Sequence, residues 1–118
     1  MKCFDPSVTK TIDLEAQTYL LNDKNYLIDF SCWDEHIRDW LASNEKIELN
    51  EEHLFVIDFL RKLFSQNRQH PVLRTVTQEM NKQYGSEKGT IKHFHSLFPG
   101  GIHQAFLIAG LSMQDSCC

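Results

Sequence analysis

The chain has 118 residues, and its 42% of hydrophobic residues can build a core, which excludes disorder for most of its length. No apolar run approaches the roughly 18–20 residues of a membrane span, and no secretory signal opens the chain, so we expect a cytoplasmic protein. The net charge of −4 argues against a general nucleic-acid binder, although residues 61–92 carry seven basic side chains against two acidic ones. We call residues 61–92 the basic belt. Residues 1–60, in contrast, carry thirteen acidic side chains and five basic ones.

The N-terminal part predicts strands. Residues 1–10 are polar and are expected to form a flexible arm, followed by a small antiparallel β-meander over residues 11–28. Residues 11–14 alternate between polar and apolar, and two short β-prone runs, 19–21 and 26–28, flank a cluster of turn-forming residues. Strands this close in sequence must pair antiparallel, because a parallel crossover needs a dozen or more residues.

Residues 29–111 predict about five helices. Apolar residues recur at helical spacing between Trp33 and Leu41, and Asn50 followed by two glutamates has the form of a helix start. We expect a break at residues 67–70 and a following helix that has Pro71 as its first residue and stops at Gly85.

Two shorter helices are expected on either side of Pro99-Gly100-Gly101, the second ending at Gly110. Strands followed by helices indicate an α+β fold in a single domain over residues 1–118. The predicted core includes Trp40, Ile57, Leu60, Phe64, Val76, Phe94 and Phe98.

The four cysteines form no zinc-binding pattern, and the histidines form no ligand set, so neither a metal nor another cofactor is expected. Cys32, beside Trp33, is expected to be a small buried residue, and Cys3 a bystander. Cys117 and Cys118 end a polar segment, 112–118, that we expect to be a mobile C-terminal arm reaching at most roughly 25 Å. The residues alone also allow these two thiols to be incidental.

Thiol chemistry requires thiolate, which nearby cations favour. The basic belt offers Arg74, Lys88 and Lys92 as groups that could lower the pKa of an arm thiol folded back over them. The alternative for each of the three is an ordinary solvated surface charge.

The stretch from Tyr19 to Cys117 resembles the DsrC/TusE family of sulfur-carrier proteins. The matching text is Leu49-Asn50-Glu51-Glu52-His53, Phe59-Leu60-Arg61, Pro71-Val72-Leu73-Arg74, Lys88-Gly89, Ser96-Leu97-Phe98-Pro99-Gly100-Gly101 and Ile108-Ala109-Gly110-Leu111, with Cys117 beyond. The resemblance implies that Cys117 carries sulfane sulfur as a persulfide. The second cysteine of the sulfite-reductase branch is replaced here by Phe106, so the chain resembles the TusE branch.

That branch implies a sulfurtransferase serving 2-thiolation of the tRNA wobble uridine. The implied partners are an upstream persulfide donor resembling TusBCD, a downstream 2-thiouridylase resembling MnmA, and its tRNA, with no membrane partner. Cys118, in a position where the family usually has another residue, could attack a persulfide on Cys117 and release the sulfur. Two alternatives remain: a DsrC-like partner of a sulfite-reductase-type system, and a DNA-binding regulator with a helix-turn-helix between Pro71 and Phe98.

Overall fold

The computed structural model describes residues 10–112 and begins with a β-hairpin. Strands β1 (Lys10–Leu14) and β2 (Gln17–Leu21) pair antiparallel, with Lys10 opposite Leu21 and Leu14 opposite Gln17. The expected third strand is reduced to one bridge between Leu21 and Leu27. The reason is local: the Asn22 side chain accepts hydrogen bonds from the backbone of Lys24 and Tyr26, which closes the loop tightly and leaves too little extended chain for a strand.

Five α-helices follow the hairpin, so the predicted α+β class is confirmed. They are α1 (Glu35–Asn44), α2 (Glu51–Asn67), α3 (Leu73–Tyr84), α4 (Ile91–Leu97) and α5 (Ile102–Ile108), and a 3-10 turn, η2 (Phe30–Cys32), precedes them. Asn50 caps α2 as predicted, since its side chain accepts from the backbone N–H groups of Glu52 and His53. Gly85 ends α3, also as predicted.

The predicted start of α3 at Pro71 is wrong. Its N-cap is Val72, with φ −87° and ψ 156°, so Pro71 lies before the helix. Arg68 ends α2 in the left-handed conformation (φ 56°), and the ring of His70 then packs against Phe64 and Phe106. The chain therefore stays extended through Val72 before it can turn into α3.

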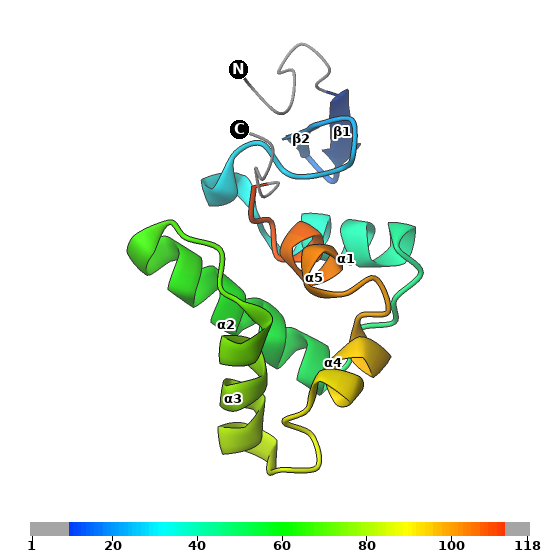
Figure 1. Ribbon diagram of the computed structural model, residues 1–118. Helices are drawn as coiled ribbons and strands as arrows, with labels where there is room; N and C mark the ends of the chain where they lie inside the picture. The colour runs from blue at the N-terminus through cyan, green and yellow to red at the C-terminus, as the bar shows by residue number, and fades with distance from the viewer. Residues whose placement is uncertain (1–9, 113–118) are drawn as a thin grey trace.

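Helix α5 lies at the centre of the molecule, in contact with both α1 and α2 (Figure 1). Its residues from Ala105 to Ile108 are all buried. The predicted core residues are buried except Trp40, which packs at the margin of the core. Within residues 10–112, no helix has the length and apolar character needed to cross a membrane.

Candidate functional site

The last described residues follow the C-terminal end of α5 and precede the cysteine pair in the sequence. Residues 108–112, which we call the arm root, begin at the last residue of α5 and end at exposed Ser112. Within the arm root, Gly110 adopts φ +77° and the backbone N–H of Leu111 donates to the carbonyl of Phe106. The helix therefore closes in a left-handed turn, an ending that glycine makes readily.

Three side chains from distant parts of the chain bind carbonyl oxygens of the arm root. Trp33 Nε1 donates to Ile108 at 2.9 Å, and Arg61 Nη1 donates to Ala109 at 2.9 Å. His70 Nε2 lies 2.7 Å from the carbonyl oxygen of Ser112, and it must donate because that oxygen can only accept. The carbonyls left without helical partners at the end of α5 are thus satisfied by side chains held elsewhere in the fold.

Arg61 is the central side chain of this arrangement. Its Nη2 donates to the carbonyl of Phe30 at 3.1 Å, and its guanidinium carbon lies 3.9 Å from the ring centroid of Phe30 and 4.2 Å from that of Trp33. Burial lowers the pKa of Arg61 to about 10, so the group remains charged near neutral pH. A positive charge is therefore fixed directly beneath the arm root.

The arm root leaves no space for a side chain at Gly110. A Cβ atom there would lie 2.3 Å from Cδ1 of Trp33 and 3.2 Å from Nη1 of Arg61. The matching segment Ile108-Ala109-Gly110-Leu111 therefore has a structural meaning, because its glycine lets two binding side chains approach the backbone closely.

Beside the arm root lies a surface hollow of about 560 Å³. The guanidinium of Arg68 stands over two aromatic rings of this hollow, 5.1 Å from Phe30 and 5.6 Å from Phe64. The lining residues are Ile28, Asp29, Phe30, Ser31, Phe64, Arg68 and Ser112. The chain thus leaves the described structure at the rim of a hollow lined by apolar and aromatic side chains together with one base, Arg68, and one acid, Asp29.

Cys32 is exposed next to this hollow, so the prediction that it is buried is wrong. It belongs to the short turn η2, where its Sγ lies 3.5 Å from Oδ2 of Asp29. Partial desolvation and the neighbouring carboxylate of Asp29 raise the pKa of the Cys32 thiol. Cys32 is therefore poorly suited to act as a nucleophile at neutral pH.

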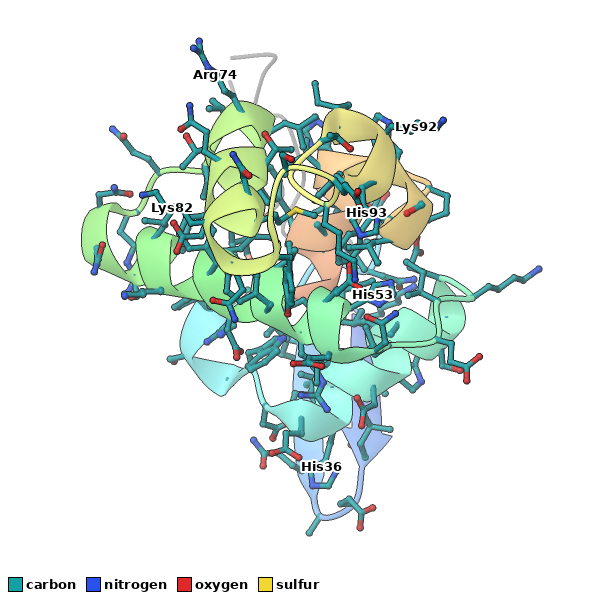
Figure 2. All side chains as sticks on the ribbon, turned by 90° about the horizontal axis from the view of Figure 1, so that it is seen from below. His36, His53, Arg74, Lys82, Lys92 and His93 are labelled. Atoms are coloured by element: carbon teal, nitrogen blue, oxygen red, sulfur yellow. The ribbon has the colours of Figure 1, made fainter. Side chains whose placement is uncertain are left out.

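The predicted basic residues divide into two kinds. Lys88 is engaged, because its Nζ lies 2.9 Å from Oε2 of Glu52, whose other oxygen lies 2.5 Å from Nε2 of His93. Hydrogen bonds from His93 and Lys88 lower the pKa of Glu52. Arg74 and Lys92 are exposed, and Figure 2 shows both extending outward in the upper part of the view, Arg74 from α3 and Lys92 from α4.

The matching motif around Asn50 ties α2 to α4. His53 Nδ1 accepts from the backbone N–H of Asn50 at 3.1 Å, and its Nε2 then donates to the carbonyl of Leu97 at 2.8 Å. With Glu52 bound to His93 of α4, two neighbouring residues of α2 hold both ends of α4. This motif is structural: it fixes the helix that carries Lys92.

Cys117 and Cys118, the predicted thiol site, lie outside the described residues, so their relation to the basic belt stays a prediction. Sequence reasoning missed the roles of Trp33, Arg61 and His70. A signal existed for Arg61, because it belongs to a matching segment, but its partner carbonyl lies 48 residues away. Within residues 10–112, no group of three or more His, Cys, Asp or Glu side chains could hold a metal ion.

Phe106, which stands where a second cysteine was considered, is 1% exposed. The rings of His70 and His103 lie edge-on to it, with centroids 5.0 and 5.7 Å away. An aromatic ring therefore fills this position as part of the core beneath the arm root.

Comparison with known proteins places these features in a family. Residues 13–118 match the sequence model of a family described as DsrC like protein. A relative named sulfurtransferase TusE, from Pectobacterium atrosepticum, is 34% identical over 107 residues, which cover 90% of this chain and 98% of the relative.

Solved structures of DsrC proteins have the same fold as this chain. The NMR structure of DsrC from Allochromatium vinosum is 32% identical, covers 93% of this chain and 99% of its own, and superposes with a TM-score of 0.82. The crystal structure of the oxidized γ-subunit of dissimilatory sulfite reductase (DsrC) from Archaeoglobus fulgidus is 27% identical, covers 92% of this chain and 100% of its own, and has a TM-score of 0.84.

Proposed function

This chain belongs to the DsrC-like protein family, and from that premise we propose that it is a sulfur-relay carrier whose Cys117 accepts sulfane sulfur as a persulfide and passes it on for 2-thiolation of the tRNA wobble uridine. The observation that supports it most is the arm root. Three side chains fix the point from which the chain runs, in five further residues, to Cys117. A relative whose match covers 90% of the chain is a sulfurtransferase by name.

The chemistry is exchange between a thiolate and a persulfide. The Cys117 thiolate attacks the outer sulfur of a donor persulfide; the new S–S bond forms at Cys117, and the donor cysteine leaves as a thiolate. The acceptor thiolate then attacks the outer sulfur on Cys117 in the same way, and Cys117 returns as a thiolate. Atoms and electrons balance without an external oxidant, so the carrier needs no cofactor of its own for either step.

The proposed donor is a complex resembling TusBCD, and the proposed acceptor is a 2-thiouridylase resembling MnmA with its tRNA bound, all in the cytoplasm. Arg74 and Lys92 are the exposed cations that we assign to docking of the arm or of such a partner. Lys88 is a weaker candidate because Glu52 already neutralises it. Cys118 is assigned the auxiliary role of releasing sulfur: its thiolate attacks the inner sulfur of a persulfide on Cys117, an S–S bond forms between the two cysteines, and hydrosulfide leaves.

The alternative, a DsrC-like role beside a sulfite-reductase-type enzyme, is favoured by the similarity to the Archaeoglobus fulgidus subunit. It requires a second thiol to pair with Cys117. The phenylalanine at position 106 cannot supply one, and the pKa of the Cys32 thiol is raised. The relay carrier therefore agrees better with the residues present.

The test is intact-mass spectrometry after incubation with a cysteine desulfurase and cysteine, followed by peptide mapping. We expect a mass gain of one sulfur on the peptide that ends in Cys117-Cys118, its loss in Cys117→Ser, and its retention in Cys118→Ser and Cys32→Ser. Full loading of Cys117→Ser would overturn the proposal.

A further inference from the structure

We propose that His70 is a positioning residue for sulfur transfer: by holding the carbonyl of Ser112, it fixes the backbone at the point from which the chain continues to Cys117. This inference rests on the proposed function, since transfer through Cys117 gives the fixed point its purpose. His70 belongs to the loop between α2 and α3, 42 residues before Ser112, so the contact is made only in the folded chain.

The hydrogen bond is not needed to satisfy a buried group. Ser112 is exposed and lies beyond the end of α5, so water could serve its carbonyl oxygen. The carbonyls of Ile108 and Ala109, in contrast, belong to buried residues and need Trp33 and Arg61 as partners. The hydrogen bond from His70 therefore serves chiefly to restrain the backbone at Ser112.

The donor is itself held rigidly. The imidazole ring lies between Phe64 and Phe106, with ring centroids 5.2 and 5.0 Å away and interplanar angles of 64° and 60°. Phe64 belongs to α2 and Phe106 to α5, so the ring is fixed by the two helices that also hold the arm root. The direction of the Nε2–H bond is thereby set by packing.

A fixed root limits where Cys117 can go. Cys117 is the fifth residue beyond Ser112, and five residues of extended chain span at most roughly 18 Å. If the His70 bond were lost, rotation about the backbone of Leu111 and Ser112 would spread the thiol over a larger volume. Its effective concentration at any one docked partner would fall accordingly.

Two substitutions separate the hydrogen bond from the packing. His70→Phe keeps an aromatic ring between Phe64 and Phe106 but removes the donor. His70→Gln keeps an N–H donor at a similar reach but removes the ring. His70→Met serves as a second variant without a donor in case His70→Phe does not fold, and urea unfolding identifies the folded variants.

The first measurement is the width of a distance distribution between two nitroxide labels, one on Cys117 and one introduced by Lys82→Cys on α3. Cys3, Cys32 and Cys118 are replaced by serine. We expect His70→Phe to widen the distribution by at least half and His70→Gln, which keeps a donor but loses the packed ring, to widen it clearly less. Equal widths for His70→Phe and the parent would overturn the proposal, as would equal widening by both variants.

The second measurement compares two reactions of Cys117, loading by a cysteine desulfurase with cysteine and alkylation by iodoacetamide. We expect His70→Phe to slow loading three- to tenfold and to change alkylation less than twofold. Unchanged loading would overturn the assignment to sulfur transfer. If the parent protein failed to load at Cys117, the proposed function would fail, whereas the distance measurement would still decide whether His70 restrains the arm.

Discussion

Nη1 of Arg61 lies 2.9 Å from the carbonyl oxygen of Ala109, across 48 residues of sequence. The same guanidinium binds the carbonyl of Phe30 and stacks on two aromatic rings, so one side chain of α2 joins the turn η2 to the end of α5. The point from which the C-terminal segment leaves is therefore part of the core packing, and its position depends on Arg61.

Arg61→Lys should destabilise the fold by about 1–3 kcal/mol, because an ammonium group cannot bind two separate carbonyls and stack on two rings as the planar guanidinium does. The free energy of unfolding in urea, measured by far-UV circular dichroism, checks this. Lys62→Ala is the matched control: the neighbouring side chain is exposed, and its loss should cost less than about 0.5 kcal/mol. Equal stability of Arg61→Lys and wild type would show that the two hydrogen bonds and the ring stacking of the guanidinium contribute nothing to the free energy of unfolding.

Gly110→Ala should lower the free energy of unfolding by about 2–4 kcal/mol. The added methyl group meets the indole of Trp33, and the alanine must adopt the left-handed backbone conformation that Gly110 has. Gly100→Ala is the control, because Gly100 has no positive φ and the three atoms nearest to a Cβ there all belong to the side chain of Gln104, the closest at 3.0 Å. We expect that control to lose about 1 kcal/mol or less. The measurement is the urea midpoint of each variant, and similar losses for the two would contradict the close packing described for the arm root.

Glu52 should make the stability of the fold depend on pH in acid. Its partners His93 and Lys88 hold the pKa of its carboxyl below the ordinary value of 4.5. The unfolded chain therefore takes up the proton first as the pH falls, so the stabilisation is complete above about pH 5 and disappears as the pH drops through the folded-state pKa.

Glu52→Gln should consequently be less stable than wild type at pH 7, and the two stabilities should converge as the pH falls through the folded-state pKa of Glu52, which lies below 4.5. Urea midpoints at pH 7, 5, 4 and 3 measure this. Glu51→Gln is the matched control, because Glu51 occupies the same first turn of α2 and feels the same helix dipole, but it is exposed. A constant difference between Glu52→Gln and wild type at every pH would argue against the ion pair as its source.

The sequence predicted the helices where capping residues and apolar spacing agree, as at Asn50 and Gly85. It failed where tertiary contacts decide: Pro71 lies before α3 because His70 packs back on the core, and the third strand is lost to the Asn22 turn. The role of Arg61 could not be predicted either, since its partners are backbone carbonyls, which every residue has. A periodic pattern shows which face of a helix is buried, but not which distant carbonyl a side chain will bind.

The last prediction concerns the two exposed cations of the basic belt. If the C-terminal arm docks against Arg74 and Lys92, their charges favour the thiolate of Cys117 and lower the pKa of that thiol. In a Cys118→Ser background, Arg74→Ala and Lys92→Ala should each raise the apparent pKa of Cys117, and the rate of its alkylation at pH 7 should fall about two- to fivefold.

The measurement is the rate of Cys117 alkylation by iodoacetamide between pH 6 and 10, followed by mass spectrometry of the C-terminal peptide. Lys82→Ala is the matched control, because Lys82 is an exposed lysine of the same basic belt and is assigned no role in docking. Its Nζ lies 3.9 Å from Oε1 of Glu79. A fall in rate that also occurs in Lys82→Ala would indicate a general effect of net charge. Unchanged profiles for Arg74→Ala and Lys92→Ala would show that neither residue tunes the thiol, and the two cations would then serve only to bind a partner surface of opposite charge.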